Sequence, residues 1–155
     1  MGRFLAGFVV GAIAGVLLTL VFVFAMATRT EPTLVTSVDV PAQARIGEPF
    51  AMRIVSRNPH DVEVQLHSVD IDESFIEAFE VLSINPQPTD SMRIPFLNQQ
   101  SWFFERDVPP GASLEIVFTL NPVRGGVPIG NVEVCNPAQD CIPASPEIEI
   151  LAEIF

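Results

Sequence analysis

The sequence predicts a two-part chain, in which one N-terminal transmembrane helix precedes an all-β domain. Residues 4–27 contain no charged side chain. Beyond residue 32, apolar and polar residues alternate in short runs, which is the period of a half-buried strand. Turn-forming residues separate these runs, and the chain has 14 prolines among its 155 residues. We therefore divide the chain into an anchor with its flanks, residues 1–29, and an extracytoplasmic domain, residues 30–155.

The apolar segment 4–27 is long enough to cross a bilayer. A helix of this length measures roughly 36 Å, against a hydrocarbon core of about 30 Å. The competing interpretation is a signal peptide cleaved after Ala27, because Ala25 and Ala27 form a small-x-small motif. Signal peptides have shorter apolar regions, of roughly 7–15 residues, so the length favours a retained anchor in the lipid bilayer.

Gly7, Gly11 and Gly15 are spaced by four residues and would lie on one face of this helix. Such a face lets a second helix approach closely, although glycine is also common in membrane helices without that role. Arg3 precedes the helix and an acidic domain follows it. This asymmetry predicts a cell-membrane protein with a cytoplasmic N-terminus and an extracytoplasmic C-terminal domain.

The external part is strongly acidic. Beyond residue 29, six arginines stand against all 19 acidic residues, a formal charge of −13. A surface this negative repels phosphate backbones, which argues against nucleic-acid binding.

The first half of the domain shows clear strand and turn signals. A strand is expected at residues 34–40 and another from residue 50, which the turn Asn58-Pro59-His60-Asp61 ends. The residues expected to face inward on these and the following strand are Phe50, Met52, Ile54, Val62, Val64 and Leu66.

The middle of the domain departs from strict alternation. Residues 72–82 have apolar residues at helical spacing, including Leu82, behind a cap at Asp72 or Ser74, which predicts a short helical turn crossing between sheets. A strand at 79–84 should follow it. Residues 85–95 contain three prolines and are expected to form an irregular loop.

The last third returns to alternation. A strand at 100–108 ends at the turn Pro109-Pro110-Gly111, and a regular alternation follows over 114–120. Further strands are expected at 132–134 and 148–154, the last with its isoleucines inward and its glutamates outward. About seven short strands with regularly spaced turns are typical of an immunoglobulin-like (Ig-like) antiparallel β-sandwich.

Several short motifs also resemble the Ig-like modules of bacterial cell-surface proteins. The resemblance covers roughly residues 34–154 and implies the fold rather than an activity. It also implies a role as a spacer, an adhesive unit or an accessory subunit. The motifs are Gly47-Glu48-Pro49-Phe50, Asn58, the run from Phe75 to Val81, and Val108-Pro109-Pro110-Gly111.

Cys135 and Cys141 enclose a turn-forming segment where two strands should meet. In an external compartment, two cysteines so close across a hairpin most simply form a disulfide. The alternatives are a zinc site with His60 and His67, or a redox-active dithiol. The spacing of these residues departs from the usual patterns of both.

Two other groups of residues are candidates for binding. Asp70, Asp72 and Glu73 are the densest acidic cluster, which could hold calcium or could simply be a solvated face. Trp102, Phe103 and Phe104 make both sides of one strand apolar. They are either packed on both faces of a central strand or exposed for contact with a protein partner.

No catalytic signature, phosphate-binding loop or metal-ligand spacing is evident in the sequence, so we predict neither an enzyme nor a cofactor. The expected function is a membrane-anchored Ig-like domain that acts through protein–protein contacts with a partner or a second copy, as an accessory subunit of a larger membrane complex. The alternative is a secreted module, released after Ala27, that binds a small ligand, a glycan or calcium.

Overall fold

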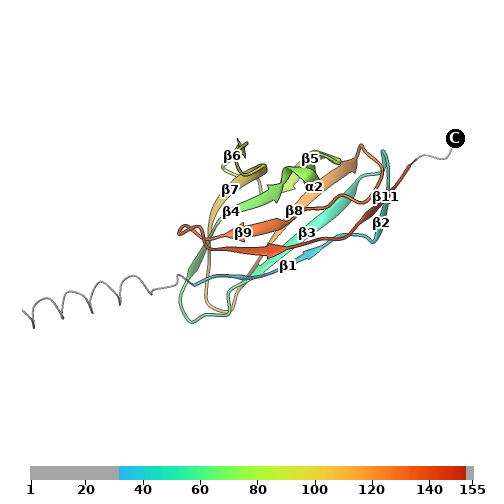
Figure 1. Cartoon of the computed structure of the whole chain (residues 1–155). Coiled ribbons are helices and arrows are strands. Elements are labelled where there is room, and N and C mark those ends of the chain that lie inside the picture. Colours follow the sequence, from blue (N-terminus) through green and yellow to red (C-terminus); the bar gives the residue numbers. More distant parts are fainter. Residues whose placement is uncertain (1–31, 153–155) are drawn as a thin grey trace, which may run out of the picture. The chain divides into compact units, whose positions relative to one another are not determined.

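A computed structural model of the chain describes residues 32–152, which form eleven strands and one short helix. Most of the strands belong to two antiparallel sheets that pack face to face (Figure 1). The four-stranded sheet has the order β1 (Val35–Asp39), β3 (Phe50–Arg57), β8 (Ser113–Pro122) and β5 (Phe79–Asn85). The five-stranded sheet has the order β10 (Cys141–Ala144), β9 (Val132–Cys135), β4 (Val64–Asp72), β7 (Gln99–Val108) and β6 (Asp90–Ile94).

The hydrophobic core lies between these two sheets. The alternation predicted for β8 is confirmed, because Ile116, Phe118 and Leu120 are fully buried and their sequence neighbours are not. The ring of Trp102 on β7 meets that of Phe118 edge-on, with centroids 5.1 Å apart. Each sheet therefore has one apolar inner face, and burial of these faces is the main force that holds the layers together.

The predicted helical turn between the sheets is confirmed. Helix α2 (Glu73–Ile76) begins after Asp72, the last residue of β4, and leads into β5 of the other sheet. Phe75 is fully buried, so the turn closes one end of the core. The Asp72 side chain does not cap the helix, because its carboxylate binds another segment.

The prediction of an irregular loop at residues 85–95 is wrong in part, because β6 lies within it. Pro86, Pro88 and Pro95 flank this strand rather than interrupt it, so they cost no ladder hydrogen bonds. Within the described part of the chain, β6 pairs with β7 alone and is largely exposed, so its side chains show no alternation.

One inward assignment is also wrong, and the helical spacing reaches less far than predicted. Val62 is 51% exposed because β4 starts only at Val64, and Val62 belongs to the preceding turn. The predicted helical spacing included Leu82, but α2 ends at Ile76 and Leu82 lies on β5. Leu82 is 48% exposed, because it points away from the face on which Phe79 is buried.

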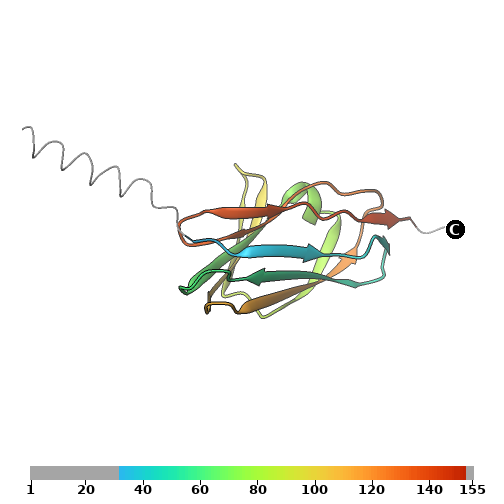
Figure 2. The ribbon, with the colours of Figure 1, turned by 90° about the horizontal axis from the view of Figure 1, so that it is seen from below.

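The C-terminal strand is shorter than predicted and joins a different partner. Strand β11 (Glu149–Leu151) pairs in parallel with β2 (Gln43–Arg45), and these two strands lie beside one another in both views (Figures 1 and 2). Ile148 and Ile150 are buried as predicted, but Ala152 is exposed.

Between residues 32 and 152 we find no helix with the length and apolar character that a membrane span requires. The predicted anchor at residues 4–27, with Gly7, Gly11 and Gly15, lies outside the described residues.

Candidate functional site

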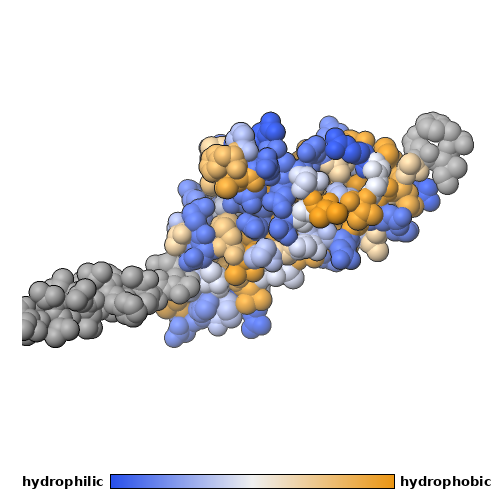
Figure 3. Space-filling model, viewed as in Figure 1, coloured by the Kyte–Doolittle hydropathy of each residue, from blue (hydrophilic) through white to orange (hydrophobic). Residues whose placement is uncertain are grey.

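An apolar segment is exposed on the connection between β8 and β9, which we call the β8–β9 loop (residues 123–131). Its side chains include Val127 and Ile129, which are 61% and 79% exposed. The space-filling view shows an apolar patch over this part of the molecule (Figure 3). A cluster of exposed aliphatic side chains is a common sign of a contact site.

Backbone hydrogen bonds hold this loop near both of its ends. The N–H of Val123 donates to the carbonyl of Ala78 at 2.9 Å, and Gly126 exchanges two hydrogen bonds with Ile150 at 2.9 and 2.8 Å. At the other end, the N–H of Asn131 donates to a carboxylate oxygen of Asp72 at 2.8 Å. The N–H of Asp72 in turn donates to the carbonyl of Asn131 at 3.0 Å.

Gly130 lets the loop lie directly on α2. A Cβ atom at this position would lie 2.8 Å from the Cβ of Phe75 and 2.9 Å from the Cβ of Asp72, closer than real Cβ atoms approach. The exposed side chains of Val127 and Ile129 are therefore presented by a backbone fixed at both ends. A surface ordered in advance loses less conformational entropy when it binds.

A hollow of about 570 Å³ lies beside these side chains. Three parts of the chain line it: residues 127–131, residues 145–147, and Asp72 with Ser74 at the start of α2. A smaller hollow of about 290 Å³ adjoins the first and shares Val127 and Ile129 with it. The carboxylates of Asp72 and Glu147 give the larger hollow an acidic rim.

Two of the three aromatic residues of β7, Trp102 and Phe104, are not exposed for the predicted partner contact. Trp102 and Phe104 are buried in the core, because they lie on the inner face of a strand that pairs on both sides. Phe103 points to the outer face, where it is half-buried and its ring lies 5.4 Å from that of His67. Of the two alternatives predicted from the sequence, packing in the core rather than exposure to a partner therefore applies to Trp102 and Phe104.

The predicted acidic cluster separates into three environments. Glu73 binds Arg93, whose hydrogen bond lowers the pKa of the Glu73 carboxyl below its ordinary value. Asp72 accepts its hydrogen bond from Asn131, and Asp70 is buried on the outer face of the five-stranded sheet. These carboxylates do not converge on one calcium position, because the chain turns into α2 at Glu73.

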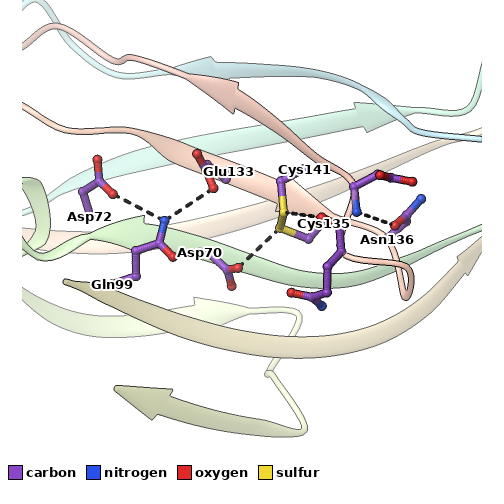
Figure 4. The surroundings of a disulfide bond; sticks show 9 residues. Asp70, Asp72, Gln99, Glu133, Cys135, Asn136 and Cys141 are labelled. Carbon is purple, nitrogen blue, oxygen red and sulfur yellow. Dashed lines mark hydrogen bonds between the residues drawn. A yellow bond between two sulfur atoms is a disulfide. The ribbon is translucent and has the colours of Figure 1, made fainter. Parts of the chain in front are cut away.

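Glu133 on β9 is a further carboxylate near Asp70 and Asp72. It lies directly opposite Asp70 in the register, and Gln99 donates to it at 3.4 Å and to Asp72 at 3.5 Å (Figure 4). Partial burial, which the Gln99 hydrogen bond only partly offsets, raises the pKa of Glu133, as do the negative charges of Asp72 and Asp70.

The predicted disulfide between Cys135 and Cys141 is confirmed. These residues face each other across the antiparallel pair β9 and β10, and Asn136 closes the turn by accepting a hydrogen bond from the N–H of Asp140. The zinc set with histidines does not form. His60 contacts the carbonyl of Thr33, His67 packs on Phe103, and the one metal-ligand group among the described residues contains Asp70 with the two cysteines.

Sequence reasoning missed the β8–β9 loop and the placement of Asp70. The only sequence signal for the loop was an apolar Val-Pro-Ile run between glycines at 126 and 130.

Comparison with solved structures places the described domain among Ig-like β-sandwiches. A cohesin module from a family 33 glycoside hydrolase of Clostridium perfringens is 12% identical, with a TM-score of 0.50, covering 79% of this chain and 100% of the module. A CARDB domain from Pyrococcus furiosus, solved in complex with di-metal ions, is 13% identical, with a TM-score of 0.50. That match covers 77% of this chain and 89% of the CARDB domain.

No family model and no curated protein matches the sequence. At these identities the structural matches establish the fold alone. They confirm the resemblance to Ig-like modules.

Proposed function

We propose that this protein is a single-pass membrane protein whose extracytoplasmic Ig-like domain binds another protein through the β8–β9 loop. The observation on which the proposal rests is the exposure of Val127 and Ile129 on a backbone that is fixed at both ends. The adjoining hollow offers a recess for an apolar side chain of the partner. The cohesin and CARDB folds are consistent with such a module.

The membrane part of the proposal depends on the sequence of residues 4–27. This segment has the length of a membrane span, and the flanking charges favour a cytoplasmic N-terminus. An anchored domain of this kind suits an accessory subunit of a larger membrane complex.

We also propose that the domain binds rather than catalyses. A general base needs a reacting group within hydrogen-bond reach. The imidazole of His60 contacts the Thr33 carbonyl, and that of His67 packs against the Phe103 ring. The exposed surface of the β8–β9 loop is mainly aliphatic, which suits contact better than proton transfer.

Photo-crosslinking in native membranes would test the contact surface. A photoreactive residue placed at position 127 should give a discrete crosslinked band, and the same residue at position 35 is the control. Val35 on β1 is 60% exposed, so the two positions are matched in residue type and exposure. Equal crosslinking from both positions, or none from position 127, would contradict the proposal.

Native mass spectrometry of the chain extracted from its membranes in mild detergent would test the anchor. The expected result is the uncleaved chain in a stoichiometric complex with a partner. Recovery of a free chain that starts at Thr28 would instead support the secreted alternative.

A further inference from the structure

We propose that Asp70, Cys135 and Cys141 form a binding site for a thiophilic divalent metal ion such as Zn²⁺ when the disulfide is reduced. The site lies on the outer face of the five-stranded sheet, because Asp70 stands between the core residues Val69 and Ile71 on β4. Figure 4 shows Asp70 beside the two cysteines. It is separate from the β8–β9 loop and goes beyond the proposed contact function.

The first observation is the state of Asp70. This side chain is only 7% exposed, and its Oδ1 atom has no hydrogen-bond partner within the described part of the chain. The Oδ2 atom lies 3.3 Å from the Sγ of Cys135. A disulfide sulfur has no proton to donate, so this contact does not satisfy the carboxylate while the bond is intact. A buried carboxylate without donors is costly, and a cation would relieve that cost.

The second observation is the convergence of three ligand atoms. A carboxylate oxygen of Asp70 and the two cysteine sulfurs all lie within 4.8 Å of one another. In a tetrahedral zinc site, with bonds of about 2.0 Å to oxygen and 2.3 Å to sulfur, ligand oxygen and sulfur atoms are about 3.5 Å apart. The separation of 3.3 Å between Asp70 and Cys135 is close to this value.

The strand register places these ligands together, in addition to the disulfide. Cys135 and Cys141 are directly opposite in the β9–β10 register, and Cys135 is opposite Ser68 on β4, two residues from Asp70. Residues two apart on a strand share a face, so Asp70 and Cys135 are diagonal neighbours on the outer side of the sheet. The sheet should hold all three positions after reduction.

The charges also favour a cation. Reduction by an external dithiol converts the disulfide to two thiols, and the dithiol becomes a disulfide. A phosphine with water gives the same two thiols and becomes the phosphine oxide. Binding of the metal ion then releases the two thiol protons, which leaves two thiolates and one carboxylate as ligands. Glu133 lies opposite Asp70 and adds to the negative field, whereas none of the ion pairs among residues 32–152 involves Asp70. Two thiolates select Zn²⁺ over Ca²⁺ or Mg²⁺.

The test uses the full chain in mild detergent, reduced with a phosphine and titrated with Co²⁺ and then with Zn²⁺. The reduced chain should show a thiolate-to-cobalt charge-transfer band that Zn²⁺ abolishes, and the disulfide form should show none. Cys141→Ser should about halve the band intensity. Asp70→Asn should weaken Zn²⁺ affinity at least about tenfold, because it replaces the anionic ligand with a neutral amide of the same size.

Glu133→Gln is the matched control, since it removes a neighbouring carboxylate that is outside the ligand set. Its effect on Zn²⁺ affinity should be much smaller than that of Asp70→Asn. The proposal is overturned if the reduced chain gives no band, if Asp70→Asn binds as tightly as the unmodified sequence, or if the disulfide form binds equally well. Circular dichroism must show that the reduced chain keeps its β-structure, and loss of that structure would also overturn the proposal.

Discussion

At the scale of single residues, Gly130 of the β8–β9 loop lies against α2 with no room for a side chain. The atoms that a side chain would meet are Cβ atoms of Phe75 and Asp72 at 2.8 and 2.9 Å, which cannot swing away as the end of a flexible side chain could. The loop therefore depends on a missing methyl group to reach its position on α2.

Gly130→Ala should destabilise the domain by about 1–3 kcal/mol, because the new methyl group forces α2 and the loop apart. Gly125→Ala in the same loop is the control, since its nearest neighbours would lie at ordinary contact distances of 3.6–3.8 Å. Both substitutions reduce the conformational entropy of the unfolded chain by a similar amount. The difference between their free energies of unfolding therefore reports the steric clash at position 130. Urea unfolding of the two variants measures this difference in stability. Equal stabilities would show that the loop can shift to accommodate the methyl group without loss of stability.

Glu133 should make the domain less stable as the pH rises. Its folded-state pKa lies above the ordinary value of 4.5. Its contribution is therefore fully present below about pH 4.5 and is lost as the pH rises through the folded pKa. Glu133→Gln removes this loss and keeps an acceptor for Gln99. The variant should be more stable than the unmodified sequence at pH 7 by about 0.2–1 kcal/mol, as expected for relief of like charges on paired strands.

Urea unfolding at pH 4 and at pH 7 measures this difference, which should shrink at the lower pH. Glu63→Gln, at an exposed position before β4, is the control for the loss of one negative charge. If Glu133→Gln increased stability by the same amount at both pH values, the raised pKa of Glu133 would not be the cause.

At the scale of elements, the strands with one buried face could be predicted from the sequence. The period of two is complete in β8, and the change to helical spacing marked α2 as the crossing between sheets. Such patterns can be read from the sequence because the side chains of a strand with one buried face alternate between core and solvent.

Strands β6 and β2 could not be predicted, because neither buries a regular row of side chains. Among residues 32–152, no strand pairs with the outer edge of β6. Strand β2 has three residues, which pair with β11 more than 100 positions away. Pairing of this kind is decided by the assembled fold and leaves no local period.

Hydrogen exchange should separate the central and edge strands of the five-stranded sheet. Strand β4 pairs with both β9 and β7 and is largely buried. Its amide hydrogens should therefore exchange only through global unfolding of the domain. Strand β6 pairs with β7 alone and is exposed. The β6 amides should exchange at least about tenfold faster than those of β4, after correction for intrinsic rates. Equal protection would show that another element covers β6.

At the scale of the whole molecule, the candidate contact surface combines three distant parts of the chain. Its hollow is lined by Asp72 and Ser74, by residues 127–131 and by residues 145–147. These segments meet because Val132 at the start of β9 pairs with Ile71 near the end of β4 and with Ala144 at the end of β10. The sequence predicted Asp70, Asp72 and Glu73 as one cluster, but the turn into α2 separates Glu73 from the two aspartates on β4. Composition and spacing could therefore predict the layers but not this surface.

Substitutions at two isoleucines should distinguish an effect on stability from an effect on partner binding. Ile148 is 1% exposed in the core beside β11, and Ile129 is exposed on the β8–β9 loop. Ile148→Ala should cost about 2–5 kcal/mol through the cavity it leaves, whereas Ile129→Ala should change stability by less than about 0.5 kcal/mol.

Partner recovery should follow the opposite order once both variants are compared as folded protein at equal amounts. Ile129→Ala should reduce the crosslinked or co-purified partner several-fold, because its side chain is already exposed and can lose only intermolecular contacts. Ile148→Ala should leave the recovery per folded molecule unchanged, since its side chain cannot touch a partner. If Ile129→Ala lowered stability as much as Ile148→Ala, or left the partner in place, the β8–β9 loop would be a structural brace rather than a contact surface.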